Sequence, residues 1–455
     1  MRNGDAYVLT QWKVDDSKRV VTGTGELQGP DRAVRQTGAF TIPVKSVALF
    51  ETNVASRSNS ATALTIMTGV SLGVSGVCLA DEKACFGSCP TFYVSDGSSS
   101  ILQAEGFSAS VLPSLEARDV DALYRAHPTQ RDFAVTMKNE ALETHITRYV
   151  HVLAARRPGG GRVVAGQDGT LWGASNVTEP ASCRAAEGDC LGAIRHFDGK
   201  ERWSEADKAD LATKETIDLD FVASPDGPLG IVISSRQSLL STFLFYQGLA
   251  YLGRSAGAAM AEAERDGNAR DALQGLARAM GGIEVMVPDG AGWRVAGETN
   301  ENGPLASDVK VVPLPAMRHG DTRVRLRLAK GHWRIDYIAM TKLEGPVQPL
   351  PLEPLSVTGR DGKVAQGVDI VTLPGDELTF SYRLPAHPEN YELFLDTRGY
   401  YLEWMRDEWL PDEDPVKAAR LILDPEQALR DLAPVYKRRE PSMEKAFWNS
   451  RYVPR

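Results

Sequence analysis

The pattern of apolar and polar residues predicts that most of this chain is β-structure. Apolar and polar residues alternate in short runs, such as residues 7–12 and 40–44, and turn signals separate the runs. Asp-Gly turns recur at 168–169, 198–199 and 226–227. Short strands at this spacing are typical of antiparallel β-sandwiches rather than of βαβ repeats.

One region in the middle of the chain has a helical pattern instead. Residues 237–253 are uncharged and apolar on most sides, which favours a buried core helix over a membrane span because the segment is short and contains Gln and Ser. Residues 269–280 then repeat apolar side chains at helical spacing, with Asn268 as the expected N-cap and two glycines at the end. A helical hairpin is therefore expected over 236–281.

The β pattern returns after this hairpin and ends in a helical tail. Residues 323–328 and 332–339 read as two strands of a β-hairpin joined at Lys330 and Gly331. In the tail, Asp-Pro pairs at 414–415 and 424–425 have the residue types of an N-cap followed by the first helical position.

The expected fold class is mainly β, with multiple β-sandwich or jelly-roll-like units, an inserted helical hairpin and a helical C-terminal tail. A length of 455 residues is too great for one ordinary core, which also indicates several units. The predicted segments are a small β-barrel or sheet (1–58), an apolar segment (59–84), a β-sandwich domain (85–235), the helical hairpin (236–281), a β-sandwich or jelly-roll portion (282–345), further strands (346–410) and the helical tail (411–455).

Composition narrows the functional classes. Hydrophobic content of 42% and charged content of 24% are ordinary for a globular protein. The formal net charge of −9 argues against a general nucleic-acid binder, because neutralising phosphates requires clustered Lys and Arg.

Four of the five cysteines occur as two closely spaced pairs. Cys85 and Cys89 flank three residues, and Cys183 and Cys190 bracket a polar loop. Short loops of this kind indicate disulfides and hence an oxidising compartment, although four cysteines allow three pairings. A metal site and free thiols are the alternatives, and the first lacks a second ligand pair. Cys78 has no assigned role.

Targeting signals are weak at the start of the chain. The first twenty residues carry charges throughout, so no cleavable signal peptide is visible. Residues 61–80 form an uncharged run just long enough to span a bilayer, but their Thr, Ser and Gly content is unfavourable for insertion. The segment is therefore either a membrane anchor or a buried small-residue segment, and a chain that begins downstream of a lost signal is a third reading.

A single motif suggests catalysis. Residues 69–73 match the G-x-S-x-G pattern, in which Ser71 would be a nucleophile on a sharp turn between a strand and a helix. The β pattern downstream does not fit an α/β-hydrolase, and a chance match in a packing segment is the competing explanation. No H-E-x-x-H, Walker A or G-x-G-x-x-G motif is present, so no metal site and no cofactor are predicted.

The predicted hairpin at 323–339 offers a binding face. Alternation places three arginines on one face of the first strand and a mixed polar set on the second strand, where several cations would surround one carboxylate. Such a face can hold an anionic ligand or a glycan carboxylate, whereas the alternative is a solvated face in which the carboxylate pairs with an arginine. The candidate binding residues are Arg323, Arg325, Arg327, His332, Arg334 and Asp336.

Four stretches of the chain carry a resemblance, namely residues 84–93, which contain the motif CFGSCPTFY, and residues 103–107, 115–120 and 139–143. Together they resemble uncharacterised bacterial cell-envelope proteins of a lipoprotein-like kind. The resemblance implies export, often with lipid anchoring, and brings no known activity. Separately, residues 333–337 are similar to the closing strand of galactose-binding-like jelly rolls.

The sequence therefore predicts a non-catalytic protein of the cell envelope, periplasmic or extracytoplasmic, that binds a protein partner or a glycan and no nucleic acid. Membrane association through residues 61–80 is part of this expectation. The alternative is a serine hydrolase that uses Ser71.

Overall fold

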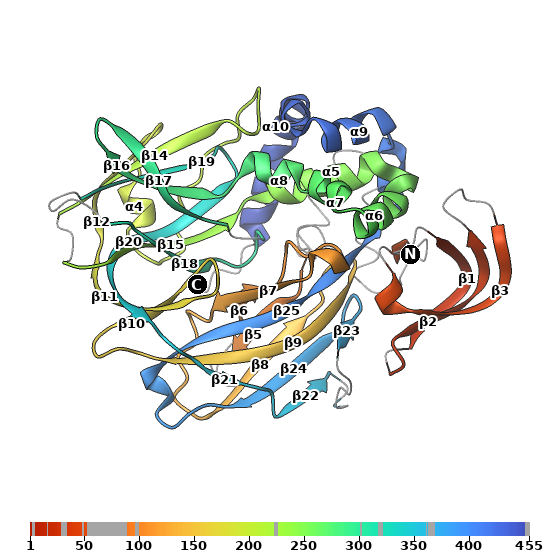
Figure 1. Cartoon of the computed structure of the whole chain (residues 1–455), viewed down its shortest axis with the longest axis horizontal. Helices are drawn as coiled ribbons and strands as arrows, with labels where there is room; N and C mark the ends of the chain where they lie inside the picture. Colours follow the sequence, from red (N-terminus) through yellow and green to blue (C-terminus); the bar gives the residue numbers. More distant parts are fainter. Residues whose placement is uncertain are drawn as a thin grey trace.

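The computed structural model confirms a mainly β fold with several sheets and a helical C-terminal tail (Figure 1). It describes residues 1, 5–15, 17–28, 34–47, 50–51, 89–95, 100–222, 226–300, 303–316, 322–360, 362 and 369–450. The predictions for the apolar segment 59–84, including Ser71 and Cys78, and for Cys85 lie outside the described residues.

Two sheets form the first β-sandwich, and their facing apolar side chains, such as Phe92, Val152 and Phe380, are its core. One sheet has the order β22 (Ser356–Gly359), β24 (Glu377–Arg383), β8 (Asp132–Lys138), β5 (Thr91–Ser95) and β6 (Ser100–Glu105). The other has the order β21 (Leu350–Leu352), β9 (Glu143–Arg156), β25 (Tyr391–Met405) and β4 (Phe50–Glu51), with β23 (Ile370–Thr372) on β9 and β7 (Ala117–Ala122) on β25.

The second β-sandwich is inserted into the first, because the chain leaves after β9 and returns at β21. A closed barrel consists of β10 (Arg162–Gly166), β11 (Leu171–Thr178), β20 (Trp333–Pro346), β15 (Leu229–Gln237) and β18 (Asp308–Pro313). The sheet that faces it has the order β13 (Gly188–Asp189), β12 (Pro180–Ala185), β14 (Lys214–Phe221), β19 (Arg323–Ala329), β16 (Ile283–Asp289) and β17 (Gly292–Thr299). Ile217, Ile231 and Leu326 belong to the core between them.

The junction between the two sandwiches is largely apolar. Val120 and Phe394 of the first sandwich share a buried cluster with Val163 and Val311 of the barrel. Strands from residues 85–235 therefore contribute to both sandwiches, and the two units bury surface against each other.

The N-terminal strands form a separate three-stranded antiparallel sheet, drawn in red in Figure 1. Its strands are β1 (Ala6–Asp15), β2 (Val20–Gln28) and β3 (Val34–Pro43). Val21 and Ile42 pack against Ile146, Tyr400 and Leu402, so the sheet is attached to the outer face of the β9–β25 pair.

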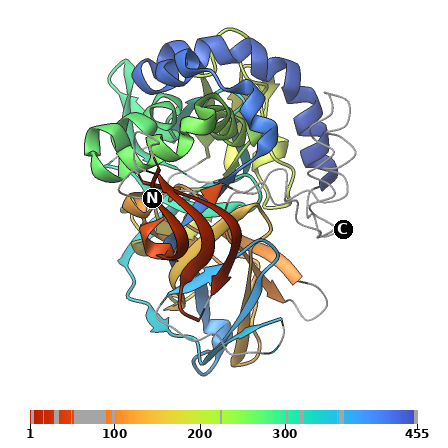
Figure 2. The same cartoon turned by 90° about the vertical axis from the view of Figure 1, so that its right-hand side faces the viewer.

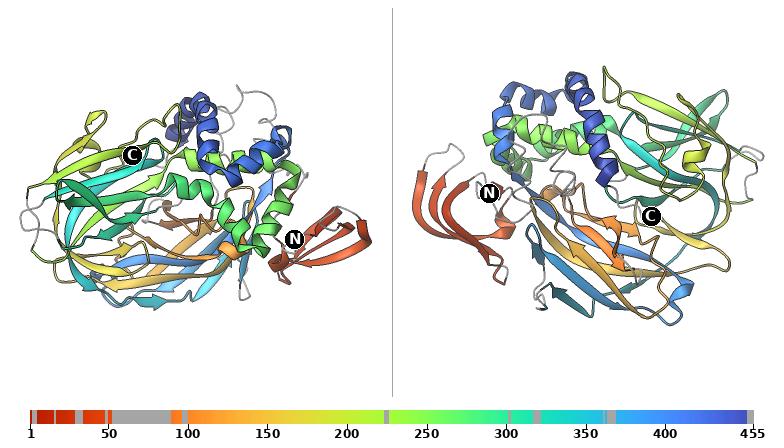
Figure 3. Two further views of the ribbon diagram at one scale, coloured as in Figure 1. Left: turned by 45° about the horizontal axis from the view of Figure 1, so that its top comes forward. Right: turned by 180° about the vertical axis from the view of Figure 1, so that it is seen from behind.

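A layer of helices lies over both sandwiches, and Figure 2 shows the blue C-terminal helices arching over the green ones. Its members are α5 (Leu239–Leu252), α6 (Ala256–Arg265), α7 (Gly267–Leu273), α8 (Gly275–Met280), α9 (Pro415–Leu423) and α10 (Pro425–Ser450). The views in Figure 3 show the same layer with its top tilted forward and from behind. None of the helices in the described ranges is long and apolar enough to cross a bilayer.

Local capping chemistry explains where several of these helices begin. The Asp414 carboxylate accepts the backbone N–H groups of Val416 and Lys417, which confirms the predicted cap of α9. The prediction of Asn268 as a cap was wrong: the Asp266 carboxylate accepts the N–H of Asn268 at 2.8 Å and begins α7 two residues earlier.

The predicted hairpin at 323–339 does not form. β19 pairs with β14 and β16, whereas β20 pairs with β11 and β15 in the other layer. Residues 330–331 thus carry the chain from one sheet to the one that faces it. Strands that face each other across a sandwich have the same apolar alternation as strands paired edge to edge, so the sequence pattern does not distinguish the two arrangements.

The cysteine predictions have two outcomes among the described residues. Cys183 and Cys190 form a disulfide with Cα atoms 5.1 Å apart, as predicted. The prediction of a disulfide at Cys89 was wrong, because Cys89 is a buried free thiol that donates to Glu105 Oε1 at 3.3 Å. The sulfur points into the interior toward a carboxylate rather than toward a second sulfur.

Candidate functional site

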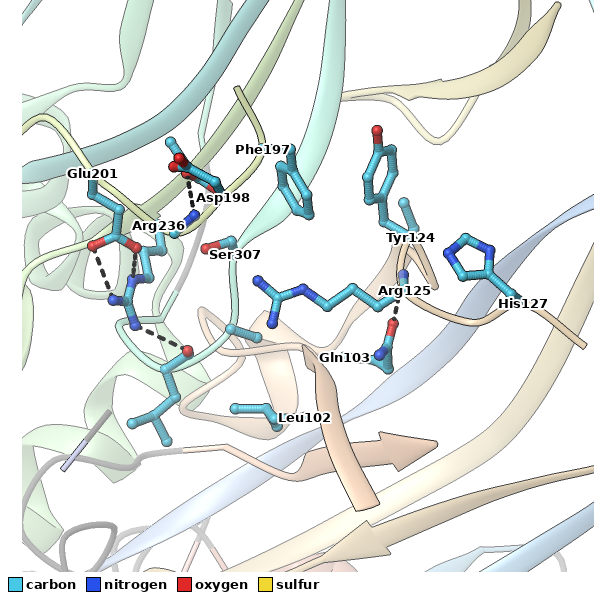
Figure 4. A pocket seen from close by; sticks show the side chains of 15 residues that line it. Leu102, Gln103, Tyr124, Arg125, His127, Phe197, Asp198, Glu201, Arg236 and Ser307 are labelled. Carbon is cyan, nitrogen blue, oxygen red and sulfur yellow. Dashed lines mark hydrogen bonds and ion pairs between the residues drawn. The ribbon is translucent and has the colours of Figure 1, made fainter. Parts of the chain in front are cut away.

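A cleft of about 350 Å³ lies at the junction of the two sandwiches (Figure 4). We call it the polar cleft. The residues that matter to its chemistry are Gln103, Tyr124, Arg125, His127, Phe197, Asp198, Glu201, Arg236, Ser307 and Asp336.

Both sandwiches supply these side chains. Gln103 lies on β6, and the segment after β7 carries residues 124–127. The loop after the short helix α4 (Leu191–Ile194) carries residues 197–201, and Asp336 lies on β20. The cleft therefore exists only when the two sandwiches are packed together, which is a common location for ligand sites.

Arg125 is the central cation of the polar cleft. Its backbone N–H donates to Gln103 Oε1 at 3.1 Å, and its guanidinium lies 5.4 Å from the ring centroid of Phe197. Figure 4 shows the side chain extending into the middle of the cleft. Among the described residues, no carboxylate forms an ion pair with this guanidinium, so its charge is available to a ligand.

The second arginine of the polar cleft is neutralised internally. Arg236 donates from Nε and Nη2 to the two carboxylate oxygens of Glu201, at 2.6 and 2.9 Å. Its Nη1 also donates to the backbone oxygen of Pro304 at 2.9 Å. This two-point pairing fixes the cleft wall and leaves the wall with little net positive charge.

Asp336 is a carboxylate of the polar cleft whose pKa is shifted by its surroundings. The pKa of Asp336 is raised to about 6, mainly by burial and also by the nearby carboxylates of Glu201 and Asp198, whereas the Gly199 N–H and Arg125 oppose the rise. The Gly199 N–H donates to Asp336 Oδ1 at 2.8 Å. The ionised side chain has further acceptor sites, so it can also accept a hydrogen bond from a hydroxyl group.

Glu105 holds the loop that forms the floor of the polar cleft. Its Oε2 accepts the backbone N–H groups of Leu305 and Ala306 at 2.6 and 2.7 Å, although Glu105 belongs to the other sandwich. Burial raises the pKa of Glu105 to about 7. Ser307 follows directly, so this carboxylate positions a lining residue without lining the cleft itself.

Two aromatic rings form one wall. The rings of Tyr124 and Phe197 have centroids 4.4 Å apart and are tilted by 60°. The Arg162 guanidinium lies 5.0 Å from the centroid of Tyr124 and supports it from outside the cleft. Rings in this position present an apolar surface beside charged groups.

Three of the candidate residues lie on the solvent side of β19, away from the polar cleft. Arg325 pairs with Asp218 at 2.6 Å and lies over the ring of Trp293. Arg327 pairs with Glu284, and Arg323 is exposed. Arg325 and Arg327 therefore each have a carboxylate partner on a neighbouring strand.

The other three candidates follow each other on β20 or just before it, and each has a different environment. His332 is buried beneath the helical layer. Arg334 is fully buried, where it contacts Glu444 of α10 and lies 3.6 Å from Glu201. Of the six candidates, Asp336 lines the polar cleft.

Sequence reasoning did not identify Arg125, Tyr124 or Phe197. They lie in loops, which carry no periodic pattern, and the Asp-Gly pair beside Phe197 was interpreted as a turn alone. The available signal is compositional: residues 124–127 and 196–199 combine aromatic and charged side chains in two short loops.

The described residues contain no group of three or more His, Cys, Asp or Glu side chains arranged to bind a metal ion. The predicted nucleophile Ser71 lies outside the part of the chain that the structure describes.

No protein-family model matches the chain, and no curated protein matches it. Among solved structures, it is similar to VP17, a capsid protein of bacteriophage P23-77, with 9% sequence identity. The match covers 62% of this chain and 94% of that chain at a TM-score of 0.11, which is too low to indicate a shared fold.

Proposed function

We propose that this protein is a non-catalytic binding protein of the cell envelope whose polar cleft holds an acidic glycan. The observation that carries the proposal is the Arg125 guanidinium, which extends into the cleft and has no carboxylate partner among the described residues. An arginine in this position can form a two-point hydrogen bond with a carboxylate.

The surroundings of Arg125 suit a sugar ring. Phe197 and Tyr124 offer apolar faces for the C–H side of a pyranose, and Asp336 can accept a hydroxyl hydrogen. A carboxylate on the sugar would neutralise Arg125. The combined requirement is a polyhydroxylated ring that bears a carboxylate, which describes a uronic acid residue of a glycan.

The acidic groups of the polar cleft favour binding over catalysis. Glu201 is held by two hydrogen bonds to Arg236, and Asp336 is held by Gly199. Carboxylates fixed in this way shape a site and select hydroxyl groups. The Cys183–Cys190 disulfide supports an oxidising compartment such as the cell envelope.

Isothermal titration calorimetry with tri-galacturonate, and with the neutral tri-galactose as its uncharged counterpart, tests this proposal. We expect binding of the acidic sugar and at least a tenfold loss of affinity in Arg125→Gln, because a charge-assisted pair contributes about 1.5–3 kcal/mol. Arg325→Gln is the matched control, since it removes an arginine outside the cleft.

Equal affinity of Arg125→Gln and the unaltered protein would reject the acidic-glycan site. Covalent labelling of Ser71 by a fluorophosphonate, abolished in Ser71→Ala, would replace the binding function with a hydrolase.

A further inference from the structure

Asp336 is almost completely buried in the wall of the polar cleft. The residue is 2% exposed, and its carboxylate accepts one hydrogen bond from a described residue, the Gly199 N–H at 2.8 Å. A carboxylate that loses its water and gains a single donor is stabilised less in its ionised form than a carboxylate in solution. The pKa of Asp336 is accordingly raised to about 6, mainly by burial.

The charges that act on Asp336 come from the elements packed around β20. Asp198 and Glu201, on the loop that carries residues 197–201, oppose its ionisation, although Glu201 is also paired with Arg236 of β15. Arg125, on the segment after β7, favours its ionisation. The other charged or titratable side chains near it are Tyr124 and His127 of the cleft wall, Lys200, which donates to Asp198, and Arg202, which donates to Glu187 and Glu215. An ionised Asp336 therefore competes with a ligand carboxylate for the attraction of Arg125.

A bound anion changes this balance. In the proposed function a ligand carboxylate pairs with Arg125, which weakens the attraction that keeps Asp336 ionised and places another negative charge in the cleft. Both changes favour a proton on Asp336. By thermodynamic reciprocity, a proton on Asp336 strengthens the pairing of the ligand with Arg125 by the same free energy.

We propose that Asp336 takes up a proton when the polar cleft binds an anionic ligand, so that the cleft holds the ligand in mildly acidic surroundings and releases it as the pH rises. This inference rests on the proposed function and adds the regulation of the same site. Protonated Asp336 can still accept the Gly199 N–H and can donate its own hydrogen to a ligand oxygen. The cleft therefore remains complementary to a polyhydroxylated ring in both states.

Isothermal titration calorimetry with tri-galacturonate at pH 5 and at pH 8 tests the inference, because the ligand carboxylates are ionised at both values. We expect a dissociation constant about tenfold lower at pH 5, the change that corresponds to a difference of one pKa unit between free and bound protein. Tri-galactose has no carboxylate and should show no such change.

Asp336→Asn has nearly the same shape and does not titrate. Its affinity at pH 8 should equal that of the unaltered protein at pH 5, and it should change less than twofold between the two values. Asp218→Asn, which alters a carboxylate outside the cleft, should keep the full pH dependence. Circular dichroism spectra of the two variants check that both are folded.

The protons taken up on binding give an independent measurement. Titrations at pH 6.5 in buffers of different ionisation enthalpy should show uptake of about half a proton by the unaltered protein, since Asp336 would be mostly ionised before binding and mostly protonated after it. Asp336→Asn should take up none. Equal uptake by the two proteins would overturn the assignment to Asp336.

His127→Gln separates Asp336 from the histidine of the cleft wall, because histidine side chains gain a proton over the same pH range. This variant should keep the pH dependence, and its loss here together with its retention in Asp336→Asn would overturn the inference. Equal dissociation constants at pH 5 and pH 8 in a protein that binds tri-galacturonate would overturn the inference and leave the proposed function standing. Absence of binding at both pH values would overturn both.

Discussion

β19 and β20 are consecutive in the chain and have similar alternations of charged and apolar residues. Their charged side chains nevertheless lie in different environments. The arginines of β19 lie on an outer face, where Arg325 and Arg327 each meet one partly exposed carboxylate. The charges of β20 lie inside, where Arg334 is fully buried and Asp336 faces the polar cleft. Burial, rather than the pattern of charge, separates a solvated ion pair from a group that can act on a ligand.

The largest expected difference between the two strands is at Arg334. Arg334→Ala leaves Glu444 and Glu201 buried with less compensation, and breaking a buried pair costs about 3–5 kcal/mol of unfolding free energy. Arg325→Ala, the matched surface variant, should cost less than about 1 kcal/mol. Urea unfolding followed by circular dichroism measures both, and equal losses would contradict the comparison.

The next largest loss of stability is expected at Gly331, in the connection that leads from β19 in one sheet to β20 in the other. Gly331 has φ +74°, and a Cβ there would lie 2.4 Å from the backbone nitrogen of Ala206. Gly331→Ala should therefore cost about 3 kcal/mol from positive φ and overlap together.

Gly290 is the control for that substitution. It also has positive φ, +57°, but it has open space around it, so Gly290→Ala should cost only about 1 kcal/mol. Thermal unfolding of both variants distinguishes overlap from backbone strain, and equal losses would show that contact with Ala206 is unimportant.

Because of Asp336 on β20, we expect the free energy of unfolding to depend on pH, an effect for which β19 has no counterpart. Because the folded-state pKa of Asp336 is raised from 3.8 to about 6, its contribution to stability is full below pH 3.8 and is lost as the pH rises through 6. Asp336→Asn should therefore gain about 2 kcal/mol relative to the unaltered protein between pH 4 and pH 7. Urea unfolding at both pH values measures this gain.

Asp218→Asn is its matched control, because this carboxylate on β14 has a side chain that is 41% exposed. A change in stability with pH as large as that of Asp336→Asn would mean that burial does not distinguish the two sites.

The smallest effect is the coupling between Arg325 and Asp218. A double-mutant cycle with alanine should give about 0.5 kcal/mol, because solvent screens the pair. Raising the salt concentration to 1 M should reduce the coupling further. A coupling above 2 kcal/mol that salt does not reduce would mean that the ion pair on β19 contributes as much to stability as a buried ion pair such as that of Arg334 on β20.

The sequence by itself determined the features that depend on neighbours along the chain. Alternation of apolar and polar residues predicted the mainly β fold. The Asp414 cap and the disulfide within 183–190 were also predicted, because a side chain reaches a few residues at most and short loops close at little entropic cost.

Only the tertiary structure decided which strands share a sheet and which side chains meet. Nothing local separates β19 from β20, because their choice of sheet depends on burying faces contributed by distant strands. Cys89 likewise faces Glu105 because two strands of the first sandwich bring them together. The polar cleft joins Arg125 to Asp336 across a junction of two units, and the free energy that forms it comes from burial between residues far apart in the chain.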